Sequence, residues 1–104
     1  MEKGILYVET YALPGEVEAY HRWYDEVHLS DFVSGVDGIV SARRFTPVDE
    51  GAPFVTVYEL EADDLEEVRA QMMVWHQERH SEPVGVDAGR PGTTRLYRLR
   101  TTFP

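Results

Sequence analysis

The stretch from Tyr20 to His28 places aromatic, acidic and imidazole side chains on one predicted helix. Trp23 and Tyr24 supply an aromatic surface, and His28 follows Tyr24 by about one helical turn. A histidine at the edge of such a surface can act as a general acid or base, because its ordinary pKa of about 6.5 lies near physiological pH. The stretch predicts a pocket for a small cyclic or aromatic molecule, with His28 as the acid or base and the two aromatic residues as walls.

A simpler interpretation is a helix that ends at the rim of the core, where His28 only hydrogen-bonds a backbone carbonyl. If His28 is catalytic, Asp25, three residues earlier, is expected to orient or charge-stabilise its ring. His21 lies one turn before Asp25. We expect His21 to be a solvated partner of that carboxylate, since pairs four residues apart are common on helix surfaces.

His76 takes the angular position on a second predicted helix that His28 takes on the first, so both could face one cleft. His80 follows His76 by four residues, a spacing that can place two imidazoles on one metal ion. The residues between them do not form the H-E-x-x-H arrangement, and the sequence offers no third ligand. We therefore predict no metal ion and name His76 as a substrate-binding residue.

Arg43 and Arg44 alternate along a predicted strand, so one points to each face of the sheet. Pairing with Glu9 or Glu59 across strands is the ordinary role of such an arginine. A buried arginine would instead bind a carboxylate or phenolate of a ligand. We name Arg43 and Tyr58 as candidate anchors for a substrate oxygen. Three tyrosines fit either a core or a pocket wall: Tyr7, Tyr11 and Tyr58.

Composition narrows the classes of function. The 104 residues carry a formal net charge of -9, which argues against nucleic acid and anionic membrane as partners. Cysteine is absent, so disulfides and thiolate chemistry are excluded, and a cytoplasmic location is expected. The apolar run from Ile5 to Val8 is too short for a signal peptide or a membrane helix. Because nucleotide and flavin motifs are missing, we expect no cofactor.

Hydrophobic periodicity and turn residues predict one domain over residues 1–104 with the order β-α-β-β-α-β. This order is typical of an α+β, ferredoxin-like fold, an antiparallel sheet with two helices on one face. Asp63 is expected to cap the second helix. The predicted strands cover residues 5–11, 39–48, 54–61 and 93–103, and the predicted helices cover residues 16–32 and 64–80. On a helical wheel the inward face of the first helix consists of Val17, Tyr20, Tyr24 and Val27, and the apolar stripe of the second consists of Leu65, Val68, Met72 and Trp75.

Both faces of the predicted sheet carry apolar side chains. Ile5 and Tyr7 alternate with apolar neighbours on the first strand, and Val55 and Val57 do so on the third. Two helices can cover only one face, so we predict that a second copy of the chain covers the other, giving a homodimer joined through the sheets. The alternative is a monomer with a rather apolar exposed face.

The chain resembles the dimeric α/β-barrel superfamily, above all its EthD-like members and related small proteins. The resemblance rests on the pattern Tyr20-x-x-Trp23-Tyr24-x-x-x-His28 and on the segment from Gly38 to Phe45. It implies a ferredoxin-like monomer paired sheet to sheet, with a ligand cleft between helices and sheet. Relatives include cofactor-free monooxygenases, lactone isomerases, polyketide cyclases and dehydratases, and haem-degrading enzymes. EthD-like chains usually carry proline where this chain has Ser30.

The leading functional hypothesis is a cofactor-independent enzyme that moves a proton on a small cyclic or aromatic metabolite, as an isomerase, dehydratase or cyclase does. A cofactor-free monooxygenase on the same scaffold is the second hypothesis. The third is a non-enzymatic dimer that binds a small ligand and releases it unchanged.

Overall fold

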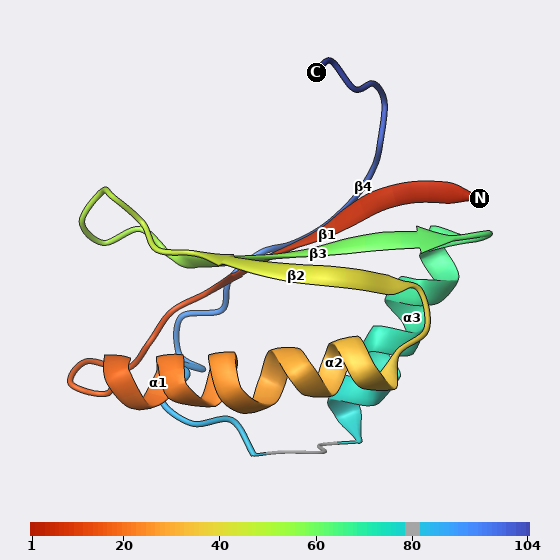
Figure 1. Ribbon diagram of the computed structural model, residues 1–104. Coiled ribbons are helices and arrows are strands. Elements are labelled where there is room, and N and C mark those ends of the chain that lie inside the picture. The colour runs from red at the N-terminus through yellow and green to blue at the C-terminus, as the bar shows by residue number, and fades with distance from the viewer. Residues whose placement is uncertain (79–81) are drawn as a thin grey trace.

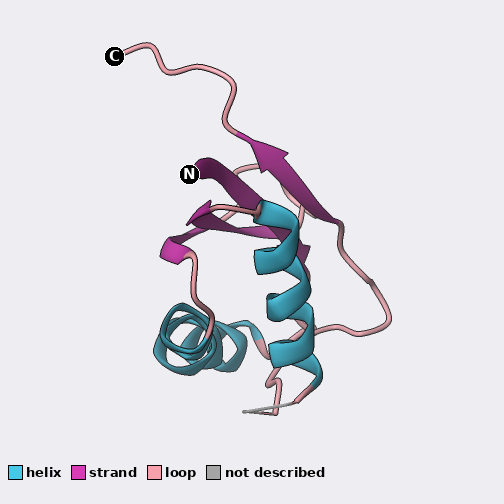
Figure 2. Cartoon of the chain, turned by 90° about the vertical axis from the view of Figure 1, so that its right-hand side faces the viewer, coloured by secondary structure: helices cyan, strands magenta, loops and turns pink. Residues whose placement is uncertain are grey.

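The computed structural model describes residues 1–78 and 82–104 and has the predicted βαββαβ order. Within these residues, four strands form one sheet, and the helices all lie against one of its faces (Figure 1, Figure 2). The elements are β1 (Glu2–Thr10), α1 (Val17–Trp23), η1 (Tyr24–His28), α2 (Leu29–Gly35), β2 (Ile39–Phe45), β3 (Phe54–Ala62), α3 (Leu65–Gln77) and β4 (Thr94–Arg98).

The sheet has the strand order β2-β3-β1-β4, and every neighbouring pair is antiparallel. This is the ferredoxin-like topology, so the predicted fold class is confirmed. Because side chains alternate along a strand, residues paired across strands share a face. Leu6, Tyr58 and Leu96 point toward the helices, whereas Tyr7, Val57 and Arg95 point to the open face.

The main core fills the layer between the sheet and the helices. Its buried residues are Leu6, Phe32, Val36, Ile39, Tyr58, Leu60, Leu65, Val68 and Met72. A second buried group consists of Tyr20, Trp23 and Tyr24, with Phe54, Ala12 and Val86 packed around it. The apolar stripe predicted for α3 is confirmed.

The first helix runs without a break from α1 through η1 into α2, and η1 is a π-helical turn. Its hydrogen bonds span five residues, as from the Leu29 N–H to the Tyr24 carbonyl. The extra residue shifts the inward face, so Trp23 is buried while Val27, expected inward, is 41% exposed. Val17, also expected inward, is exposed at the first position of α1. Turns of this π type are frequent at functional sites.

Several element ends differ from their predicted positions. Asp64, and not Asp63, caps α3, because its extended backbone lets its side chain accept a hydrogen bond from the Glu66 N–H at 3.0 Å. Strand β2 ends at Phe45, three residues early. Strand β4 stops at Arg98, since that residue pairs with Gly4 and few residues of β1 remain beyond it.

The C-terminal tail leaves the sheet on the side opposite the helices (Figure 1). The Leu99 N–H still bonds the Lys3 carbonyl at 2.8 Å, and beyond it the chain departs from the body of the protein. Phe103 is almost fully exposed there. Among the described residues, the helices are too short or too polar to cross a membrane.

Candidate functional site

His28 ends the π turn and lies between the two buried groups of the core. Its ring stacks on Trp23, five residues earlier, with centroids 4.4 Å apart and an interplanar angle of 26°. It meets Tyr24 and Phe32 edge-on, at centroid distances of 4.8 and 4.7 Å. The His76 ring of α3 lies 6.5 Å away. The π turn makes these ring contacts possible, because its i→i+5 hydrogen bonds bring residues five apart onto the same side of the helix.

Burial lowers the pKa of His28 from its ordinary 6.5 to about 4, and the charges of His76 and Arg44 act in the same direction. The Asp31 carboxylate opposes them and raises this pKa. His28 is therefore a neutral imidazole at pH 7. A neutral imidazole has a nitrogen lone pair that can accept a proton from a bound molecule.

Asp31 is fixed by a contact between the two helices. The Trp75 Nε1–H of α3 donates to Asp31 Oδ2 at 2.9 Å. Trp75 can approach so closely because Gly35 has no side chain, and a Cβ there would lie 2.1 Å from the indole ring. We did not single out Asp31 from the sequence, although its spacing three residues after His28 was a usable signal.

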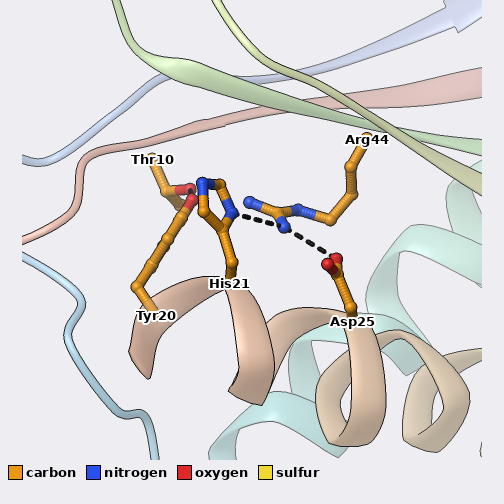
Figure 3. Close-up of polar contacts among 5 residues, drawn as sticks. All are labelled: Thr10, Tyr20, His21, Asp25 and Arg44. Carbon is orange, nitrogen blue, oxygen red and sulfur yellow. Dashed lines mark hydrogen bonds and ion pairs between the residues drawn. The ribbon is translucent and has the colours of Figure 1, made fainter. Parts of the chain in front are cut away.

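Arg44 points from β2 to the first helix, and its guanidinium lies between His21 and Asp25 (Figure 3). Nη1 is 2.8 Å from Asp25 Oδ1 and 3.0 Å from His21 Nδ1. The cation also lies over the rings of Tyr24 and Tyr20, 4.4 and 5.1 Å from their centroids. Only 10% of the Arg44 side chain is exposed, so this charge is largely removed from water.

The sequence predicts His21 to be a solvated partner of Asp25, and this prediction is wrong. His21 is partly buried and belongs to the Arg44 cluster. A guanidinium only donates hydrogen bonds, so His21 Nδ1 must be the acceptor and the ring proton sits on Nε2. Burial and the Arg44 charge lower the pKa of His21, while Asp25 raises it. The His21 ring also packs edge-on against Phe54 at 4.7 Å.

Arg43, named as a substrate anchor, lies on the open face of the sheet. Its side chain is 62% exposed, and its Nη2 is 3.3 Å from Glu59 Oε1. A bulge between Ile39 and Ser41 decides which of the two adjacent arginines faces the helices. Such a bulge leaves no clear trace in the sequence, and Arg44 takes the place that we had given to Arg43.

Asp25, expected to orient His28, instead binds Arg44 and is 58% exposed. In a regular α-helix Asp25 and His28, three residues apart, would be neighbours on one face. Both residues belong to the π turn, which rotates His28 toward Trp23. The carboxylate that acts on the His28 charge is therefore Asp31.

Tyr58 of β3 and Tyr24 of η1 are buried in the same layer. Burial raises the pKa of both phenols, so both keep their O–H protons at physiological pH. The ring centroids of Tyr58 and Phe32 are 5.8 Å apart, and Phe32 in turn contacts His28. The structure thus brings most of the predicted site together. Trp23, Tyr24, His28 and Tyr58 share one layer, and the exposed His76 lies beside it, 6.5 Å from His28 between ring centroids. Their roles toward a ligand stay predictions.

The two histidines should respond to different carboxylates. We expect Asp31→Asn to lower the pKa of His28 further, because it removes the charge that raises it, and to leave His21 unchanged. Asp25→Asn should lower the pKa of His21 and leave His28 unchanged. Titration of the ring C–H resonances by NMR checks both. A shift of His28 in the Asp25 variant would instead restore the orienting role first expected of Asp25.

Residues 1–78 and 82–104 contain no group of three or more histidine, cysteine, aspartate or glutamate side chains that could hold a metal ion. His80, the suggested partner of His76, lies outside the described residues. The expected absence of metals and cofactors stays a prediction.

No protein-family model matches the chain, and no curated protein matches it. A solved structure with the same fold is reported as that of a "putative monooxygenase" from Shewanella loihica PV-4. The match has a TM-score of 0.58 and 19% sequence identity, and it covers 98% of this chain and 99% of that one. At this identity the likeness establishes the fold alone, so this chain shares with that protein a small ferredoxin-like α+β architecture.

Proposed function

We propose that the protein is a cofactor-independent enzyme that transfers a proton on a small cyclic or aromatic metabolite. The observation that carries the proposal is His28, an uncharged base enclosed by four rings in the layer between helices and sheet. Its pKa of about 4 keeps it neutral at pH 7. Trp23 and Tyr24 would form the walls for a flat ligand.

A base with so low a pKa is weak, so the substrate C–H or O–H must be made acidic by its surroundings. Two features supply this. The phenols of Tyr24 and Tyr58 keep their protons and can donate to a substrate oxygen. The Arg44 cation acts electrostatically on His28 and on both tyrosines, so it would also stabilise negative charge forming on a ligand among them. Returning the proton to another atom completes an isomerisation, and loss of hydroxide as water completes a dehydration.

A second candidate, a cofactor-free monooxygenase, is favoured by the description of the fold neighbour from Shewanella loihica PV-4. It shares the first step, removal of a proton by His28. The electron-rich substrate anion would then react with dioxygen. A CH₂ group becomes a carbonyl, one oxygen atom enters the product, the other leaves as water, and the substrate supplies the electrons.

A panel of cyclic ketones, lactones and hydroxylated aromatics, incubated with purified protein in an oxygen electrode, separates the candidates. Product formation without oxygen uptake supports proton transfer, and one dioxygen consumed per product supports the monooxygenase. Recovery of every bound compound unchanged, with and without a chelator, would favour the third hypothesis, a ligand-binding dimer.

The proposed assembly is a homodimer joined through the open sheet faces. That face carries apolar residues at its centre and equal numbers of basic and acidic residues among those described: Lys3, Arg43 and Arg95 against Glu9, Glu59 and Glu61. It is therefore neutral in a chain of net charge -9, so two copies can meet there without like-charge repulsion. The C-terminal tail also projects to that side (Figure 1).

A further inference from the structure

Arg44 has a buried hydrogen-bond donor that the protein does not use. Both of its side-chain hydrogen bonds leave from Nη1, to Asp25 and to His21. Its Nε is buried and has no partner. A buried N–H without an acceptor is costly and rare in folded proteins, and a donor on a charged group is the least tolerated case.

The arginine is also short of negative charge. Among the described residues its carboxylate partner is Asp25, which is 58% exposed and so is partly screened by water. His21 is neutral where it accepts from Arg44. The remaining neighbours are the faces of Tyr24 and Tyr20, which hold the guanidinium plane without satisfying its N–H groups.

We propose that Arg44 is the subsite for an anionic oxygen, a carboxylate or a ring-bound oxyanion, on an aromatic or cyclic ligand. Asp25 and His21 hold Nη1, the tyrosine rings fix the plane, and Nε–H remains to bind the ligand oxygen. The inference rests on the proposed function only in taking this layer as the ligand site, and it names the class of molecule that the site accepts.

A ligand would approach Arg44 from the edge of the sheet. Strand β2 is an outer strand, and Arg44 reaches the first helix beside Asp25 (Figure 3). The Asp25 side chain is 58% exposed. A ligand oxygen at Nε would place the attached ring near Tyr24, the residue that also borders His28. Anion binding and proton transfer would then act on one bound molecule.

The direct test follows the Arg44 Nε–Hε resonance by NMR while benzoate or 4-nitrophenolate is added at pH 8. The neutral partners benzamide and 4-nitroanisole are added to parallel samples. We expect either or both anions to shift the Arg44 resonance and the neutral compounds to leave it in place. If benzoate alone acts, the site takes carboxylates; if 4-nitrophenolate alone acts, it takes ring oxyanions. No shift with either anion, or equal shifts with the neutral compounds, overturns the proposal.

Variants give a second measurement by calorimetry. Arg44→Gln should weaken binding of the active anion by about 10- to 100-fold, as loss of a charge-assisted hydrogen bond predicts. Arg43→Gln is the matched control, because it removes the same charge one residue away on the open face, and it should leave the affinity unchanged. Unchanged affinity in Arg44→Gln would refute the assignment. Because calorimetry measures binding without turnover, the anion-binding proposal can be confirmed or refuted even if the proposed enzyme activity is not found.

Discussion

Replacement of His28 by alanine is expected to lower turnover by about 10²- to 10⁴-fold, the usual contribution of a positioned proton-transfer group. His28→Gln should do the same, because glutamine fills part of the space but cannot take up a proton. The loss should appear mainly in kcat, with a smaller effect on KM, since Trp23 and Tyr24 would still bind the ring. Steady-state kinetics on the substrate found in the oxygen-electrode panel measures both.

Stability separates this expectation from a purely structural role. At pH 7 His28→Ala should cost about 1 kcal/mol of unfolding free energy, as for a typical substitution. Glu26→Gln is the matched control, since Glu26 lies in the same π turn with its side chain exposed, and it should change neither activity nor stability. A His28→Ala protein that loses much stability and keeps full activity would show that the histidine only supports the core.

The pH dependence adds an independent signature. The free-enzyme pKa of His28 is about 4, so kcat/KM should stay level as the pH falls through 6.5 and decline only near pH 4. The same lowered pKa also affects stability. As the pH falls, His28 is protonated near pH 6.5 in the unfolded state but only near pH 4 in the folded state, so the free energy of unfolding decreases between these two values. His28→Gln should remove that part of the acid destabilisation.

Much of the fold follows from local patterns in the sequence. The alternation in β1 and β3, the stripe Leu65, Val68 and Met72 on α3, and the glycines after the first helix were enough to predict the ferredoxin-like topology. The same alternation also indicates that the open face of the sheet carries apolar side chains. These features depend on near neighbours in the chain, which periodicity reports well.

The details of the site depend on irregularities that periodicity cannot detect. A wheel drawn at 3.6 residues per turn assumes a regular helix, so it turned Val27 inward and paired Asp25 with His28. The π turn alters both relations. The bulge in β2 likewise decided between Arg43 and Arg44. Asp31 gains its place from Trp75, which lies 44 residues further along the chain. Such tertiary contacts determine the positions of the site residues, and the neighbouring sequence gives little indication of them.

Val57→Asp is expected to convert the proposed dimer into a folded monomer. Val57 lies on β3, between Tyr7 and Arg43 in the register, at the centre of the open face. A carboxylate there would have to lose its hydration in a sheet-to-sheet dimer, and its neighbour Arg43 is already paired with Glu59. We expect a cost of about 3 kcal/mol or more, which raises the dissociation constant by over 100-fold. In the monomer the same side chain would meet water.

Sedimentation at micromolar concentration should give the wild-type protein about twice the 11.9 kDa chain mass and the Val57→Asp protein the single chain mass. Val74→Asp introduces the same change on the outer side of α3, where the valine is already exposed, and should leave the dimer intact. Circular dichroism establishes that each variant is folded. A folded wild-type protein that sediments as a monomer contradicts the assembly, and the apolar open face would then have to be explained as an exposed surface of the single chain.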